Sequence, residues 1–459
     1  MFLSDTIAAI STGMTNSGIG IVRITGSEAF RIADKVFKLK KGTKKISEMK
    51  SHTVHYGYIY DDDKVVDEVL ITVMRAPNTY TREDTVEINC HGGIIVTNKV
   101  LETVLKKGAR PAEPGEYTKR AFLNGRIDLS QAEAVIEVIN AKNQYALSNS
   151  VNQLKGAVSE KIKLIRDKLM NHMAYIEAAL DDPEHISLDN YMEKLQPAAA
   201  QIKNELKMLL DSSDNGRILY EGIKTVILGK PNAGKSSLLN LLVGEERAIV
   251  TDLEGTTRDT LEENILINGI SLNIIDTAGI RDTEDRVEQI GVERAKKCAD
   301  EAELILYVLD SSRNLDKNDE EIFKMIKGKK TILLYNKCDL SSKIKEEEIE
   351  KRTDAPIVKI SAKLGDGMDQ LEKLIKEMFF NGKITVNDEV FITNARQKSD
   401  ILNAYQSILM VEESINAGVS EDFYTIDLMN AYESLGRVIG EAVEEDLVNT
   451  IFHKFCMGK

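Results

Sequence analysis

The 459-residue chain is 42% apolar and 29% charged, a composition typical of globular proteins, and its length predicts about three domains at roughly 150 residues each. No apolar run approaches the ~18 residues of a membrane span, residues 1–5 lack a signal-peptide pattern, and four scattered cysteines disfavour disulfide or zinc frameworks and indicate a reducing cytoplasm. The net charge of −14 excludes a generic polyanion binder, so a nucleic-acid partner would need a local basic patch.

The first 118 residues carry mixed strand and helix patterns. Tyrosines at alternate positions before a run of three aspartates indicate a β-hairpin, because alternation is the period of a half-buried strand. The expected elements are strands at 18–24 and 85–90, helices at 27–39 and 94–106, and a hairpin that joins 54–60 to 65–74. This segment therefore predicts an α+β domain over residues 1–118.

Helical patterns cover residues 119–215 and 383–459, whereas residues 216–382 between them alternate strands with helices. In the first helical segment, apolar residues recur at helical spacing over 128–140 and 148–180, and Pro183 ends the pattern. The simplest arrangement is a P-loop GTPase domain of α/β class inserted into a helical domain. The sequence thus predicts a multidomain fold of α+β and α/β class.

A phosphate-binding loop follows the strand expected at 226–228. Gly229-Lys230-Pro231-Asn232-Ala233-Gly234-Lys235-Ser236 matches G-x-x-x-x-G-K-[ST] and leads into a helix, which is the context that supports this motif. Backbone N–H groups of such a loop surround the phosphates, Lys235 reaches the β- and γ-phosphates, and the Ser236 hydroxyl can bind Mg²⁺. The residues expected around the phosphates are Asn232, Ala233, Gly234, Lys235, Ser236 and Ser237.

The segment Asn336-Lys337-Cys338-Asp339 follows an apolar strand and distinguishes GTP from ATP. A carboxylate at Asp339 accepts from N1–H and N2–H₂ of guanine, a donor pair that adenine lacks. Asn336 supports either the loop or the guanine O6, and the stem of Lys337 packs on the ring. Ser361-Ala362-Lys363, after the next strand, completes the base pocket through backbone amides.

Two further segments are expected to sense the γ-phosphate. Asp276-Thr277-Ala278-Gly279 follows the strand expected at 271–275, and 255–259 reads as switch I with Thr257 as a second Mg²⁺ ligand. Ras-like GTPases position the attacking water with a glutamine just after the D-x-x-G motif, but this chain has Ile280 there. Another polar group must take that role, and the nearby candidates are Asp282, Glu284, Asp285 and Glu288.

Several motifs together resemble the MnmE (TrmE) family of tRNA-modification GTPases, and the resemblance spans essentially the whole chain. The motifs are Gly20–Ile24, Pro114–Arg126, Gly229–Ser236, Gly255–Asp259 and the terminal Phe455–Lys459. The resemblance implies a homodimer that acts with the flavoprotein MnmG (GidA) in a heterotetramer. The pair would modify C5 of the wobble uridine (position 34) of certain tRNAs to (carboxymethyl)aminomethyl-uridine, using a one-carbon unit from tetrahydrofolate.

The resemblance also implies roles for individual residues. The folate, 5-formyl- or 5,10-methylene-tetrahydrofolate, would contact Arg23, Glu87, Arg126 and Lys459. Activation by K⁺ would use Asn232, Thr251, Leu253 and Thr256. Glu288 would position the water, and the role of Cys456 stays open. The remaining residues implied around GTP and Mg²⁺ are Asp252, Glu254, Gly255 and Thr257.

Two alternatives stay open at this point. One is a non-enzymatic GTP switch in ribosome assembly or at membranes, which would favour an RNA-binding module or a basic amphipathic tail after Lys383; neither is visible in the sequence. The other is a GTPase of the same architecture without the folate role. Retention of labelled 5-formyltetrahydrofolate by the purified protein separates these possibilities.

Overall fold

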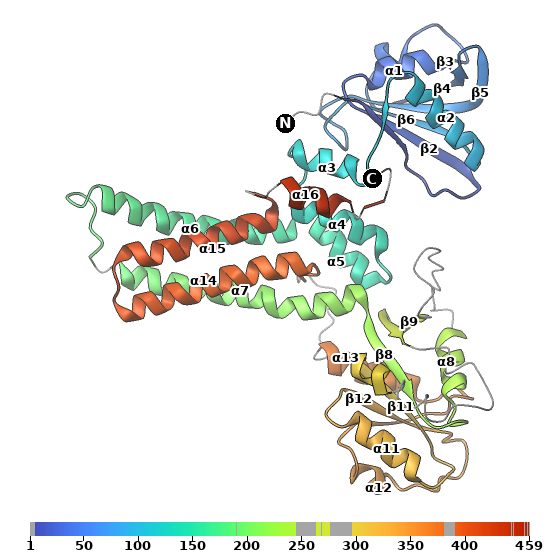
Figure 1. Ribbon diagram of the computed structural model, residues 1–459, viewed down its shortest axis with the longest axis vertical. Coiled ribbons are helices and arrows are strands. Elements are labelled where there is room, and N and C mark those ends of the chain that lie inside the picture. Colours follow the sequence, from blue (N-terminus) through green and yellow to red (C-terminus); the bar gives the residue numbers. More distant parts are fainter. Residues whose placement is uncertain are drawn as a thin grey trace. The chain divides into compact units, whose positions relative to one another are not determined.

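The computed structural model describes residues 5–189, 191–244, 263–267, 269–275, 296–380, 391–441, 443, 445–453, 455–456 and 458 (Figure 1). The chain forms two compact units. The first combines Met1–Ile136, Gln153–Ile202 and Asn403–Lys459, and the second combines Glu137–Asn152 with Lys203–Leu402. Each unit therefore joins segments that lie far apart in the sequence.

A seven-stranded sheet organises the start of the first unit, in the order β3-β4-β5-β6-β2-β1-β7. Its strands are β1 (Ile7–Ile10), β2 (Ser17–Thr25), β3 (Phe37–Leu39), β4 (Thr53–Asp61), β5 (Lys64–Met74), β6 (Thr85–Gly92) and β7 (Arg110–Pro111). Helices α1 (Ala29–Val36) and α2 (Ile94–Lys106) bury their apolar residues against one face, where Val22, Ile24 and Ile88 are fully buried. Because side chains alternate along a strand, Arg23 and Glu87 lie on the opposite face.

The helix expected over residues 27–39 is shorter than predicted. It ends at Val36, and residues 37–39 form strand β3 instead, with Phe37 paired to Ile59 of β4. Phe37 is buried, Lys38 is exposed and Leu39 is half-buried, so the period has changed from that of a helix to that of a strand. Pairing with the edge of β4 outweighs the local helical tendency there.

The helices outside the two sheets are α3 (Glu116–Leu123), α4 (Leu129–Asn140), α5 (Gln144–Leu154), α6 (Ala157–Asp181), α7 (Met192–Glu221), α14 (Ala395–Ala417), α15 (Glu421–Ile439) and α16 (Glu445–Phe452). The single pattern expected over 148–180 is in fact two helices. Gly156 lies between them with φ of +100°, a left-handed conformation that ends one helix and begins the next. Helices α6 and α15 pack along one another (Figure 1).

A six-stranded sheet forms the centre of the second unit, in the order β13-β12-β11-β8-β10-β9. All neighbouring pairs are parallel except β10 with β9. The strands are β8 (Ile223–Leu228), β9 (Glu263–Ile267), β10 (Ile270–Ile274), β11 (Leu304–Asp310), β12 (Thr331–Asn336) and β13 (Ile357–Lys359). The helices are α8 (Lys235–Gly244), α11 (Lys317–Ile326), α12 (Glu346–Glu350) and α13 (Met368–Phe380). The predicted α+β and α/β fold class is confirmed.

The turn between α4 and α5 (residues 141–143) belongs to the second unit and packs against its sheet. Asn143 precedes α5, and its Oδ1 accepts from the Ala146 amide at 2.8 Å, which caps the helix. Its Nδ2 donates to the Leu219 carbonyl of α7 at 2.9 Å and to Ser271 Oγ of β10 at 3.2 Å. The Tyr145 ring lies directly on Gly269, where an added Cβ would come within 2.5 Å of it. Across the described residues, no helix is both long and apolar enough to cross a membrane.

Candidate nucleotide and N-terminal sites

The phosphate-binding loop joins β8 to α8, as the sequence predicts. Asn232 has φ of +63°, and Gly234 has φ of +103°. A Cβ on Gly234 would lie 2.2 Å from Nδ2 of Asn336, so glycine is required by space as well as by conformation. The loop is therefore held close to the guanine segment.

Lys235 directs its ammonium across this loop. Its Nζ donates to the carbonyls of Gly229 at 2.7 Å and Lys230 at 2.9 Å. Burial lowers the pKa of Lys235 from its ordinary value. An ammonium held by neutral carbonyls can exchange them for phosphate oxygens, because charge-assisted hydrogen bonds are the stronger kind.

Asn336 joins three segments of the expected nucleotide site. It is 2% exposed, its Nδ2 donates to the Ala233 carbonyl at 2.8 Å, and its Oδ1 accepts from the Ala362 amide at 3.0 Å. Both ends of the amide are thus used to hold loops. Of the two roles that the sequence left open, the structure shows loop support.

Lys337 and Asp339 continue the same turn. Lys337 has φ of +65°, and its Nζ donates to the Asn232 carbonyl at 2.9 Å and to Oδ2 of Asp310 at 2.7 Å. Asp339 is exposed, and its Oδ1 accepts from Ser361 Oγ at 2.8 Å. The structure therefore brings the phosphate loop, the Asn336–Asp339 turn and Ser361-Ala362 together, as expected of a guanine pocket. Lys363 is exposed beyond them.

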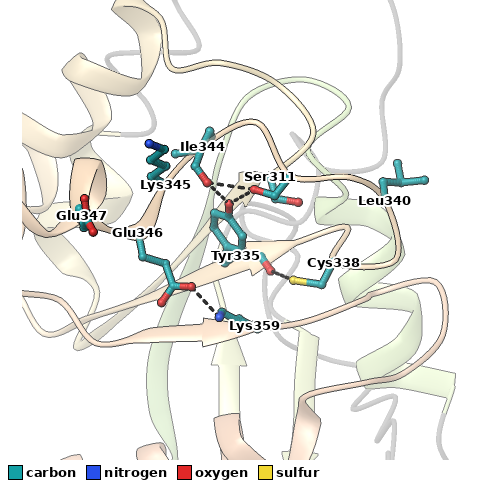
Figure 2. Close-up of a pocket in the computed structure, with 10 residues that line it drawn as sticks. Ser311, Tyr335, Cys338, Leu340, Ile344, Lys345, Glu346, Glu347 and Lys359 are labelled. Atoms are coloured by element: carbon teal, nitrogen blue, oxygen red, sulfur yellow. Dashed lines mark hydrogen bonds and ion pairs between the residues drawn. The ribbon is translucent and has the colours of Figure 1, made fainter.

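A cavity of about 420 Å³ borders the same turn but is lined mainly by other residues (Figure 2). Tyr335 occupies its centre, and the Tyr335 hydroxyl lies against Ser342 and the Ile344 carbonyl. Glu346 and Lys359 form an ion pair at its edge. Cys338 connects this cavity to the guanine turn, and its thiol donates to the Tyr335 carbonyl at 3.0 Å. None of the phosphate-loop residues lines the cavity.

Several of the expected site residues lie outside the described residues. Strand β10 ends at Ile274, and the following Ile275 amide donates to Thr225 of β8 at 2.9 Å, so the described chain stops beside the phosphate-loop strand just before Asp276. The expected residues outside the described part are Thr251, Asp252, Leu253, Glu254, Gly255, Thr256, Thr257, Asp276, Thr277, Ala278, Gly279, Glu288 and Lys459.

Arg23 and Glu87 face each other across β2 and β6. They are paired in register, and Arg23 Nε donates to Glu87 Oε1 at 2.8 Å, with about a fifth of each side chain exposed. The Arg23 guanidinium also lies 5.4 Å from the centre of the Tyr117 ring, and the Tyr117 hydroxyl donates to the Arg23 carbonyl at 2.8 Å. The pair is fixed by its neighbours yet remains partly accessible.

Arg126 lies near the Arg23–Glu87 pair, and Tyr80 is the residue beside both arginines. The Arg126 guanidinium lies 4.7 Å from the centre of the Tyr80 ring, and the Tyr80 hydroxyl is 2.9 Å from Thr118 Oγ1. Burial raises the pKa of Tyr80, whereas the charges of Arg126 and Arg23 both oppose that rise. Three of the four predicted folate residues are therefore gathered in one region.

The C-terminal residues reach the same sheet. Gly458 has φ of +84°, and a Cβ on it would lie 2.1 Å from the carbonyl of Ile10 in β1. The Gly115 amide donates to the Cys456 carbonyl at 3.4 Å. Tyr80 and Tyr117 had not been expected at this site. Tyr117 lies within the motif 114–126, but its contact with Arg23 spans 94 residues and has no local sequence signal.

Comparison with known proteins gives matches over nearly the whole chain. Residues 129–456 match the family model of the MnmE helical domain, and residues 6–126 match that of the GTP-binding protein TrmE N-terminus. A tRNA modification GTPase MnmE from Lachnoclostridium phytofermentans is 59% identical, covering 99% of this chain and 100% of that protein. A protein of the same name from Clostridioides difficile is 49% identical, covering 100% of both.

Solved structures match a smaller part. The G domain of the FeoB iron transporter from T. maritima is 27% identical and covers 34% of this chain and 97% of that chain, with a TM-score of 0.26. Era in complex with MgGDPNP and a segment of 16S ribosomal RNA is 30% identical and covers 41% of this chain and 67% of that chain, with a TM-score of 0.27.

Proposed function

Because the chain belongs to the MnmE family of tRNA modification GTPases, and is a GTP-hydrolysing enzyme of tRNA modification, we propose that it acts on C5 of the wobble uridine (position 34). The reaction would install a (carboxymethyl)aminomethyl group together with a flavoprotein of the MnmG type. The one-carbon unit would come from a tetrahydrofolate. The relatives favour this enzyme over a non-enzymatic GTP switch.

The proposed GTP site assigns a task to each described segment. Asp339 recognises guanine, Asn336 holds the two loops around the base, and Lys235 binds the β- and γ-phosphates. This assignment is supported by the hydrogen bonds that already join Ala233, Asn336 and Ala362. Outside the described residues, Glu288 would orient the attacking water.

The proposed cation sites use oxygen atoms of side chains and, at Leu253, of the backbone carbonyl. Ser236 with Thr257 would hold Mg²⁺, and Asn232 with Thr251, Leu253 and Thr256 would hold K⁺. Asn232 fits this role, because Lys337 binds its carbonyl while its exposed side-chain amide makes no hydrogen bond within the described part of the chain. The chemistry such cations supply is neutralisation of charge that develops on the phosphates during hydrolysis.

The folate proposal rests on the group formed by Arg23, Glu87 and Arg126. A reduced folate has a flat pterin with N–H donors and an anionic glutamate tail. Glu87 can accept from the pterin, and the two arginines can bind carboxylates. Half-buried Tyr80 provides an aromatic face beside Arg126, whereas Tyr117 is fully buried and packs against Arg23. The approach of Gly458 to β1 supports Lys459 as a further cation of this site.

Retention of radiolabelled 5-formyltetrahydrofolate by the full chain tests the folate proposal. Arg126→Ala removes one charge-assisted hydrogen-bonding group and should weaken binding by about one to two orders of magnitude, with basal GTP hydrolysis unchanged. Arg31→Ala, on α1 at the opposite sheet face and 70% exposed, is the matched control and should bind normally. If Arg126→Ala and deletion of Lys459 both retain folate, the site lies elsewhere.

We also propose a homodimer with the N-terminal domain (1–118) at its interface, a helical domain of 119–215 and 383–459, a G domain of 216–382 and a cytoplasmic location. Gel filtration with light scattering tests the dimer. A mass equal to that of a single 51.2 kDa chain at micromolar concentration would contradict it.

A further inference from the structure

Lys230, the second residue of the phosphate-binding loop, pairs with two carboxylates at the start of α11. Its Nζ lies 2.6 Å from Oδ2 of Asp319 and 2.9 Å from Oδ2 of Asp316, and 16% of its side chain is exposed. The loop is therefore attached by a side chain to a helix about 90 residues later in the sequence. The motif itself gives this position no role.

Asp319 is buried, with 1% of its side chain exposed, and both of its carboxylate oxygens have hydrogen-bond partners. Its Oδ1 accepts from the hydroxyl of Tyr307 at 2.8 Å, and its Oδ2 accepts from the Asp316 amide at 2.9 Å. Tyr307 is itself fully buried and packs edge-on against Phe323. A buried carboxylate needs a cation, and among the described residues Lys230 is the only one that pairs with it.

The backbone of Lys230 points to the catalytic side of the loop. Its carbonyl accepts from Nζ of Lys235 at 2.9 Å, the same ammonium that is expected to bind the β- and γ-phosphates. Lys230 therefore contacts the buried Asp319 and the exposed Asp316 through its side chain, and the phosphate-binding Lys235 through its carbonyl. Movement of Lys230 would change both sets of contacts.

The charges of Lys230, Asp316 and Asp319 determine how this group affects a bound polyphosphate. Asp316 and Asp319 bring two negative charges to a loop that must hold a polyphosphate, and Lys230 lies between them and the loop. We propose that Lys230 is a positioning residue for GTP, whose ammonium screens the phosphates from Asp316 and Asp319 and whose carbonyl holds Lys235. The third phosphate adds about one negative charge, so the screening favours GTP over GDP.

Affinities of the full chain for fluorescent GTP and GDP analogues test this proposal. With Lys230→Met, GTP affinity should fall about tenfold more than GDP affinity, as expected for one extra charge at about 10 Å in an effective dielectric of about 20. Lys317→Met is the matched control, because Lys317 is an exposed lysine in the first turn of the same helix. It should leave the ratio of the two affinities unchanged.

Two more variants separate screening from a purely structural role. Lys230→Arg keeps the cation and should keep the wild-type ratio. The double variant Lys230→Met, Asp319→Asn removes the buried carboxylate charge together with the lysine that pairs with it, so no unpaired buried charge destabilises the fold. It should restore most of the GTP preference. Equal loss of GTP and GDP affinity in Lys230→Met would overturn the proposal. So would a double variant whose ratio stays as low as that of Lys230→Met alone.

Discussion

The side chain of Asn336 offers the sharpest test of how the guanine pocket is assembled. Replacing it with alanine leaves two buried groups without partners, the Ala233 carbonyl and the Ala362 N–H. An unsatisfied buried group costs about 1–3 kcal/mol, so the pair corresponds to about 2–4 kcal/mol once some water enters. The two loops should then separate more easily, and GTP binding should weaken because the pocket is no longer preorganised.

Amide hydrogen exchange measures this effect at the bond itself. In Asn336→Ala, exchange of the Ala362 amide should accelerate by about one to two orders of magnitude. Asn336→Asp is the matched variant, since its carboxylate still accepts from Ala362 but cannot donate to Ala233. It should keep Ala362 protected while still weakening GTP binding. Unchanged Ala362 exchange in Asn336→Ala would refute the reasoning, because the amide would then be protected by something else.

The other predictions concern the nucleotide chemistry. Asp339→Asn should shift preference from GTP to XTP, since the amide donates to the O2 that replaces the amino group of guanine. Competition binding measures both affinities, and unchanged GTP affinity with no gain for XTP would contradict the guanine pocket. GTP turnover should rise strongly when KCl replaces NaCl at matched ionic strength, and Asn232→Ala should abolish that rise; equal rates in both salts with the unaltered chain count against the K⁺ site. Glu288→Ala should bind GTP normally but hydrolyse it slowly in single-turnover assays. The proposed role of Glu288 is to orient the attacking water, without a contact to GTP before the reaction. A parallel loss of affinity would make Glu288 structural.

Sequence periodicity predicted most of the fold because each sheet has a recognisable burial pattern. Strands of the seven-stranded sheet alternate buried and accessible residues, whereas β11 and β12 of the six-stranded sheet are buried on both faces and are continuous apolar runs. The β4–β5 hairpin and the strands β8 and β12 lie where alternating or apolar runs placed them. The failures occurred where a short segment could either continue a helix or pair with a strand, and where one residue's backbone conformation interrupted a helix. Residues 37–39 pair with β4 instead of extending α1, and a left-handed Gly156 divides a helical pattern that is otherwise continuous.

The segments of the candidate nucleotide site could be located from the sequence because the residues of each motif are close together in the chain and their chemistry is specific. What the motifs could not give was the set of contacts that hold them. The double hydrogen bond of Asn336 and the ion pairs of Lys230 join residues 26 to 103 positions apart, which no local pattern reveals. The same holds for the placement of Tyr80 and Tyr117 beside the predicted folate residues.

The contacts of Asn143, in the turn between α4 and α5, affect how the G domain can be studied as a fragment. A fragment limited to residues 216–382 would remove the amide that binds Leu219 and Ser271, and it would uncover the Gly269 turn on which Tyr145 packs. Because Ser271 lies on the strand that leads to Asp276, sliding of β10 along its axis must stretch or break its bond to Asn143. Rates measured on such a fragment would therefore describe a domain in which β10 lacks the hydrogen bond that Asn143 makes to Ser271 in the full 459-residue chain.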